Sequence, residues 1–355
     1  MSYFSNFLNT KDWLQTFPSS WTTRVEISSF SFAFCIKKCI VVHQTYLLGG
    51  RNYIDEEFLL VSPSGHILDN SPIYRRAKFI PSSYCYDFAN SVCKISPWSA
   101  FDEELCDSSL KYFHAAKPNY GHVILDFMPE FCALYKTIKS SNGSFFVGSN
   151  PDPVLYESVR LLDNSSSSCL KTSPFPHKYS GRSYRIYLAT NVILSPLNSR
   201  CDRITELFNT LLPAIPPIPS SHSVAKNIFI NRTANSRVLL GPEAQKWLLY
   251  SNYVTYDLTK MNLIYTAWLI SSASNIVMAL GAETSNLIFA SPMATSHILL
   301  SQHNLSSPHY LNIITDTIIP ITNSNVFLHP LPSEAQDGQH QGMADSKIIL
   351  NNCLV

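Results

Sequence analysis

The sequence has 355 residues, of which 45% are hydrophobic and only 14% are charged, with 26 Lys and Arg against 25 Asp and Glu. The length predicts about two domains of ~100–200 residues each, and the apolar fraction excludes disorder over most of the chain. A formal net charge of +1 and the lack of basic clusters argue against a nucleic-acid partner, which needs a concentrated positive surface.

The N-terminal third contains short apolar runs and turns rather than long helical patterns. Alternating or continuously apolar residues predict strands over Val25–Ile40, Cys39–Leu48, Glu57–Val61 and Ile67–Asp69. We therefore expect a sheet-rich N-terminal extension.

The segment Asn119–Lys139 is the first strong helical pattern of the chain. Apolar residues recur at helical spacing and define one stripe: Ile124, Phe127, Phe131, Leu134 and Ile138. Pro129 lacks a backbone N–H, so we expect it to kink or loosen this helix.

His122 and Asp126 lie four residues apart at the start of that helix. This spacing puts both side chains on one face, roughly 140° from the apolar stripe at ~100° per residue. A carboxylate that orients an imidazole is a common general-base arrangement. The structural alternative is an ordinary surface His–Asp pair at the start of a helix that Asn119 caps.

Further strands and helices follow up to residue 212. The pattern predicts strand Ser144–Gly148, helix Pro153–Leu162, strand Tyr184–Leu194 and helix Asp202–Leu212.

A proline-rich stretch, Pro213–Ser223, has four prolines in eleven residues and reads as a semi-rigid linker. We place the domain boundary there. The predicted organisation is an N-terminal domain over residues 1–212, a linker over 213–224, a C-terminal domain over 225–330 and a tail over 331–355. Packing of the tail back on the N-terminal domain is left open.

The C-terminal domain alternates strands and helices regularly. The predicted order is strand Asn227–Asn231, helix Pro242–Ser251, strand Tyr253–Tyr256, helix Thr259–Ser272, strand Asn275–Leu280, helix Thr284–Ala290 and strand His297–Leu300. Continuously apolar strands in such an alternation predict a parallel sheet covered on both faces, and hence a Rossmann-like domain.

Ligands of such sheets bind beyond the carboxyl ends of the strands. The loop after Asn231 carries Arg232 and Arg237, whose guanidinium groups suit a pyrophosphate. After the strand that ends at Leu280, Gly281 would allow close backbone approach, and Thr284 or Ser285 could cap the next helix. The alternatives are that the two arginines are solvated surface charges and that the Gly281 segment is an ordinary turn.

Met261–Thr315 contains a single formal charge, Glu283. Met261–Leu280 is long enough to span a bilayer, but its Asn and Ser residues and the break at Gly281 favour a buried helix followed by a buried strand. A membrane-embedded protein remains the rival interpretation.

Nine cysteines at irregular spacing, with no CxxC, predict reduced thiols rather than a disulfide framework. The sequence starts without a basic segment followed by an apolar run. We therefore expect a cytoplasmic protein without a transmembrane segment, with peripheral membrane association left open.

Three motifs occur together in a fixed order between Lys117 and Leu300. They are Asn-x-Gly-His with an Asp four residues on and a Pro three further, a strand ending in Asn-Arg with a second Arg five residues later, and Gly-Ala followed by Ser-Asn-Leu-Ile-Phe. In this combination the chain resembles glycosyltransferase family sixty-one. These are inverting sugar transferases that act on xylans, on glycoproteins and, in bacteria, on capsular or surface polysaccharides.

The resemblance implies an α/β fold of the GT-B type, with two Rossmann-like domains facing a cleft. The C-terminal domain would hold a nucleotide-diphosphate-sugar as donor substrate and the N-terminal domain an oligosaccharide or polysaccharide acceptor, with no metal and no further cofactor.

The resemblance also implies roles for individual residues. His122 and Asp126 match the catalytic His-plus-acid motif, and Pro129 matches its proline. Arg232 and Arg237 would neutralise the donor diphosphate. The remaining donor-binding positions form the glycine block: Gly281, Ala282, Glu283, Ser285 and Asn286.

The glycine block departs from the family pattern at two positions. The family usually has His where this chain has Leu280, and Gly where it has Glu283. A carboxylate repels a diphosphate unless it turns away or contacts a sugar hydroxyl. We therefore expect a hexosyl- or pentosyltransferase of surface or capsular polysaccharide synthesis, and keep a non-catalytic carbohydrate- or nucleotide-binding relative with a decayed donor site as the alternative.

Overall fold

The computed structural model describes residues 22–28, 31–47, 54–61, 84–87, 92–95, 101–114, 120–162, 169–173, 184–193, 200–231, 238–240, 246, 248–300, 311–312, 314–330 and 342–344. The chain divides into two compact units that alternate along the sequence. Unit 1 comprises Met1–Pro118, Glu130–Asp152 and Ser165–Ser199, and unit 2 comprises Asn119–Pro129, Pro153–Asn164 and Arg200–Val355. The predicted domain limits at residues 212 and 225 stay predictions.

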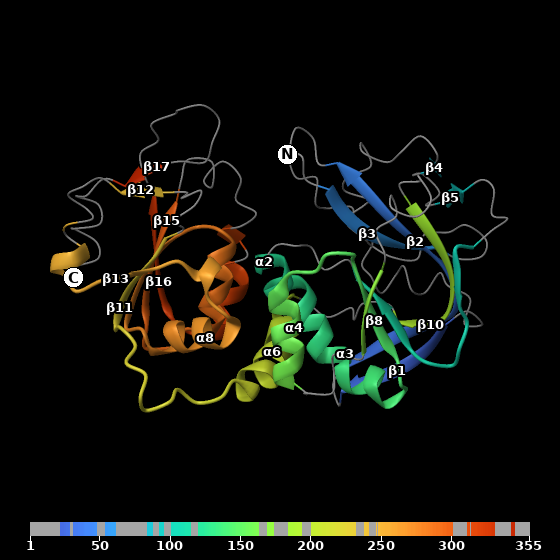
Figure 1. The fold of residues 1–355 in the computed structure, drawn as a ribbon, viewed down its shortest axis with the longest axis horizontal. Helices are drawn as coiled ribbons and strands as arrows, with labels where there is room; N and C mark the ends of the chain where they lie inside the picture. The colour runs from blue at the N-terminus through green and yellow to red at the C-terminus, as the bar shows by residue number, and fades with distance from the viewer. Residues whose placement is uncertain are drawn as a thin grey trace. The chain divides into compact units, whose positions relative to one another are not determined.

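Unit 1 is built on one mixed sheet of eight strands with the order β1-β2-β10-β7-β8-β9, in which β3 also pairs with β2 and β6 with β10 (Figure 1). The strands are β1 (Thr22–Ser28), β2 (Ser31–Leu47), β3 (Ile54–Val61), β6 (Glu103–Leu105), β7 (Lys111–Phe113), β8 (Ser144–Val147), β9 (Leu170–Thr172) and β10 (Tyr184–Ile193). A separate hairpin pairs β4 (Tyr84–Asp87) with β5 (Val92–Ile95).

The sheet of unit 1 has an antiparallel part and a parallel part. β1, β2 and β3 pair antiparallel, as does β10 with β2, which confirms the predicted sheet-rich N-terminal region. β10, β7, β8 and β9 pair parallel. The predicted strand Ile67–Asp69 lies outside the described residues.

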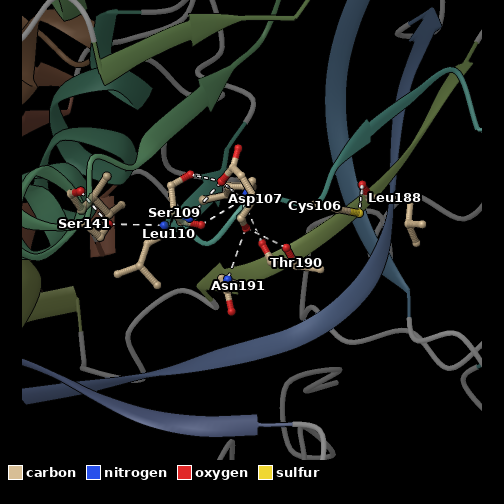
Figure 2. A network of polar contacts seen from close by, with 10 residues as sticks. Cys106, Asp107, Ser109, Leu110, Ser141, Leu188, Thr190 and Asn191 are labelled. Carbon is tan, nitrogen blue, oxygen red and sulfur yellow. Dashed lines mark hydrogen bonds and ion pairs between the residues drawn. The ribbon is translucent and has the colours of Figure 1, made fainter.

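A buried lysine ties the loop before β7 to the neighbouring strand β10. Lys111 is 2% exposed, and its ammonium group donates to Asp107 Oδ1 at 2.9 Å, to the Ser109 carbonyl at 2.9 Å and to the Thr190 carbonyl at 3.2 Å. The Asp107 carbonyl accepts a further bond from the Asn191 amide in the same network (Figure 2). The hydrogen bond from Lys111 is the main cause that lowers the pKa of Asp107 to about 2. Because this network sits before the amino end of a parallel strand, we assign it to stability rather than to ligand binding.

We expect Lys111→Met to lower the free energy of unfolding by about 2 kcal/mol, because the Asp107 carboxylate and the Ser109 and Thr190 carbonyls lose a charged donor at once. Urea unfolding followed by circular dichroism measures this loss. The matched control is Lys136→Met on an exposed position of α3, which should change stability by less than about 0.5 kcal/mol. Equal stability of the two variants would contradict the structural role.

Unit 2 contains a sheet of five strands, all parallel, with the order β13-β11-β14-β15-β16. The strands are β11 (Asn227–Ile230), β13 (Val254–Tyr256), β14 (Asn275–Ala279), β15 (Thr295–Leu300) and β16 (Asn325–Pro330). This confirms the predicted parallel α/β architecture of the C-terminal half. A small parallel pair joins β12 (Val238–Leu240) to β17 (Gly342–Ala344).

The central strands of unit 2 are buried on both faces. Ile276, Val277 and Met278 of β14 are all fully buried, and so is Ile298 of β15. Met261–Leu280 folds as helix α8 (Leu263–Ser272) followed by β14, which is the buried helix and strand that the sequence favoured. Among the described residues, none of the helices has the length and apolar character to cross a membrane.

The helices of unit 2 pack on one another beside this sheet (Figure 1). They are α4 (Pro153–Leu162), α6 (Arg200–Leu211), α8 and α11 (Ile319–Thr322), with short 3-10 turns η5 (Leu212–Ala214), η6 (Leu258–Lys260) and η7 (Ala282–Phe289) and a π turn η8 (Ile314–Ile318). Of the predicted helix Pro242–Ser251, residues 246 and 248–250 are helical and residue 251 lies in a turn, while the others lie outside the described residues.

Candidate functional site

The helical segment that carries His122 and Asp126 is not a regular α-helix. It begins as α2 (Tyr120–His122), continues as the π-helix η3 (Val123–Phe127) and becomes α3 (Met128–Ser140). The Met128 N–H bonds to the Val123 carbonyl, five residues back. The expected loosening at Pro129 thus takes the form of a wide turn directly before the residue that lacks an N–H.

His122 and Asp126 form the expected pair on this segment. His122 Nδ1 lies 2.6 Å from Asp126 Oδ2, and the two side chains are 37% and 31% exposed. On the other side of the turn Ile124 and Phe127 are buried in the core. Because this contact is short, we assign a proton to Nδ1, which donates it to the Asp126 carboxylate. Nε2 is then the basic nitrogen.

The glycine block forms a compact 3-10 turn directly after β14. Gly281 has an extended backbone and precedes η7 without any side-chain cap. The prediction that Thr284 or Ser285 caps a helix is wrong, because their hydroxyl groups donate to the carbonyl oxygens of Gly281 and Ala282, three residues back. These polar side chains are buried and hold the turn itself together.

The start of the helix packs directly on this turn, within unit 2. A Cβ added to Gly121 would lie only 3.2 Å from the Ala282 Cα and 3.4 Å from its carbonyl oxygen. The Tyr120 hydroxyl donates to the side-chain oxygen of Asn286, and the Asn286 amide donates to the Glu283 carbonyl at 3.0 Å. The structure therefore joins the predicted catalytic pair and the predicted donor block in one compact unit.

This junction lies at the carboxyl ends of the parallel strands of unit 2. In chain order the five strands run 2-1-3-4-5 across the sheet, so the order reverses between β11 and β14. Such a reversal point is where ligands of open parallel sheets bind. Asn231 follows β11 there and Gly281 follows β14. Arg232 and Arg237, which come next in the chain, lie outside the described residues.

The neighbouring helix α8 has its amino end occupied by the protein itself. The Glu157 carboxylate of α4 accepts the Leu263 N–H at 2.6 Å, and Asn262 caps the helix through the Tyr265 N–H at 2.8 Å. A carboxylate at this end satisfies the helix dipole. The turn after β14 therefore remains the better position for an anionic ligand.

The family model for glycosyltransferase 61 matches residues 120–297, half of the chain. The chain belongs to glycosyltransferase family 61. The match begins at Tyr120, the first residue of α2, and continues through β14 and the glycine block into β15. A comparison with curated proteins finds no match. Family membership supports glycosyltransferase activity, with a sugar donor and an acceptor.

Two features of the site were not among the predicted site residues. Tyr120 bonds to Asn286 across 166 positions of sequence, and Gly121 provides the close approach to Ala282. A glycine within a helical pattern was the available signal, since it often marks close packing. A partner so far away in the sequence left no local signal.

We expect Gly121→Ala to destabilise the protein by about 1–3 kcal/mol, because the new methyl group meets backbone atoms that cannot rotate away. Helix propensity alone predicts the opposite sign, a gain of roughly 0.5–1 kcal/mol. Urea unfolding decides between the two. The control is Ser140→Ala at the exposed end of the same helical segment, where no loss should appear. A stabilised Gly121→Ala variant would exclude the tight contact.

Proposed function

We propose that the chain is an inverting glycosyltransferase that moves a sugar from a nucleotide-diphosphate-sugar to a glycan hydroxyl. The acceptor O–H gives its proton to His122 Nε2 while its oxygen bonds to the anomeric carbon. The bond from that carbon to the diphosphate breaks, and the leaving group takes the electron pair. Asp126 orients the imidazole and stabilises its charged form.

The observation that carries this proposal is the packing of α2 on η7. Gly121 and Tyr120 contact Ala282 and Asn286 of the turn that follows β14, at the reversal point of the sheet, and His122 is the next residue of the helical segment. A base and a donor-binding turn that share one compact unit need no reorganisation between them, which favours catalysis by fixed positioning.

The same turn suggests where the diphosphate of the donor binds. The first N–H groups of a helical turn have no partner within it, and Gly281 brings no side chain to the N-cap. We infer that the diphosphate binds there without a metal ion, with Arg232 and Arg237 neutralising the charge that grows on the leaving group. The glycine block supplies the remaining donor contacts.

The wider assignment follows from the family resemblance. We propose a GT-B architecture in which unit 2 binds the donor, and a hexosyl- or pentosyltransferase in surface or capsular polysaccharide synthesis. Such an enzyme would act in the cytoplasm, where nucleotide-sugars are used, with peripheral membrane association where its acceptor is membrane-bound.

Thermal stabilisation by nucleotides tests the donor site. We expect one nucleoside diphosphate and its sugar conjugates to raise the melting temperature, since ligand at about 100 times its Kd adds ~2.7 kcal/mol to folding. Arg232→Ala and Arg237→Ala should lose most of this shift, and Arg160→Ala, an exposed arginine on α4, should keep it. No shift with any nucleotide would favour the non-catalytic relative with a decayed donor site.

Transfer assays with the nucleotide-sugar so identified test the base. We expect His122→Ala to lower kcat by roughly 10²–10⁴-fold, because general-base assistance is lost, while the nucleotide-induced shift persists. His222→Ala, at an exposed histidine of the proline-rich stretch, is the matched control. Unchanged turnover by His122→Ala would remove His122 from the mechanism.

A further inference from the structure

The proline-rich stretch Pro213–Ser223 takes no part in the proposed mechanism. It belongs to unit 2, where it connects helix α6 to strand β11, and it is the yellow loop between them in Figure 1. Residues 216–223 are all exposed, and the stretch contains no Asp, Glu, Lys or Arg. A connecting loop needs neither this many prolines nor an exposed apolar surface, which points to a second role.

The sequence itself restricts the backbone of this stretch. Every residue from Ile215 to Pro219 is either a proline or the residue before one. Proline holds φ near about −65°, and the residue before a proline is confined to the extended region. Ile215 has φ −71° and ψ 122°, close to the polyproline II values of about −75° and about +145°. Residues 215–219 therefore form a short polyproline II segment.

Pairs of an isoleucine and a proline repeat with the period of that helix. Polyproline II has about three residues per turn, and Ile215-Pro216 is followed three positions later by Ile218-Pro219. The two pairs therefore lie on the same side of the segment, one turn apart. Proline has no backbone N–H, so within Pro216–Pro219 only Ile218 could donate to a neighbouring strand. This excludes a partner that pairs with the segment as a β-strand.

Two contacts with Trp268 of α8 hold the stretch in place. The indole N–H donates to the Pro216 carbonyl at 2.7 Å, and the His222 ring packs edge-on against the same indole, with 5.7 Å between the ring centroids. The His222 N–H also bonds to the Pro219 carbonyl at 2.9 Å, which closes a turn after the segment. Because the fold already holds the extended form, a partner that binds it loses little conformational entropy.

The exposed surface of the segment is apolar. Ile218 is 36% exposed, and the exposed residues Pro217 and Pro219 lie on either side of it. A single exposed hydrophobic side chain is common, but here the apolar residues are continuous along the segment. Grooves lined by aromatic side chains bind such segments through proline rings and backbone carbonyls. Trp268 makes one bond of this kind inside the chain, to the Pro216 carbonyl.

We propose that residues 215–219 are a docking site for a separate protein module whose groove is lined by aromatic side chains and binds polyproline II segments. The rings of Pro216 and Pro219 pack in that groove, and Ile218 adds an apolar contact. A nucleic acid or an anionic lipid surface would need basic residues, which the stretch lacks. The inference goes beyond the proposed function and does not depend on it, since a decayed donor site would leave this segment unchanged.

The test titrates the full chain, up to about 1 mM, against a panel of purified, fluorescently labelled SH3, WW and EVH1 domains and measures Kd by anisotropy. The double variant Pro216→Ala/Pro219→Ala removes both rings and keeps the carbonyl that Trp268 contacts. Ile218→Asp keeps both prolines and puts a charge on the apolar surface. The control is Pro213→Ala, an exposed proline in the 3-10 turn η5, outside the extended segment.

We expect at least one module of the panel to bind wild type. The double variant and Ile218→Asp should each bind that module about tenfold more weakly or worse, whereas Pro213→Ala should bind it like wild type. The melting temperatures of the variants should stay close to that of wild type, because the substituted side chains are exposed. Unchanged melting temperatures separate a loss of docking from a defect in folding.

Three results would each overturn the proposal. The first is that no module of the panel binds wild type. The second is that the folded double variant or folded Ile218→Asp binds as tightly as wild type, because the rings and the isoleucine would then not be in the contact. The third is that Pro213→Ala loses as much binding as the other variants, because the docking site would then not be the polyproline II segment.

Discussion

The packing of α2 on η7 is the contact on which the site depends. Gly121 lets the helix approach the Ala282 backbone, and the Tyr120–Asn286 bond fixes the rotation of the helix about that contact. This contact sets the position of the helix that carries His122 and Asp126 relative to the turn after β14. The π turn before Pro129 then accommodates the lost N–H without breaking the segment that carries the pair.

The fold was largely predictable where a single periodic pattern decides it. The apolar strands of β11, β14 and β15 and the stripe that begins at Ile124 gave the right elements, because burial on both faces and burial on one stripe leave distinct patterns. The alternation of the chain between two units was beyond such reasoning. Residues 119–129 join unit 2 through packing of α2 on η7, and residues 153–164 through packing of α4 on α6 and α8. Local sequence does not encode these pairings.

In the candidate site, local contacts were predictable and long-range contacts were not. Residue types and spacing brought His122 and Asp126 together, since an i, i+4 contact is a local property of a helix. Residue types also predicted a turn at Gly281. They did not predict its 3-10 form, in which the buried Ser285 hydroxyl bonds to a carbonyl oxygen of the same turn.

The departure at Glu283 can now be weighed against the structure. A glycine would be required at this position if the backbone had a positive φ, but the described non-glycine residues with positive φ do not include Glu283. Its carbonyl also accepts the Asn286 amide in the same turn as the Tyr120 contact. The substitution therefore costs the fold nothing through backbone strain, and its consequence is electrostatic. If the turn binds a diphosphate as proposed, a carboxylate there would weaken nucleotide affinity unless Arg232 and Arg237 outweigh it. Under that proposal, donor affinity rather than stability would separate a working transferase from a decayed one.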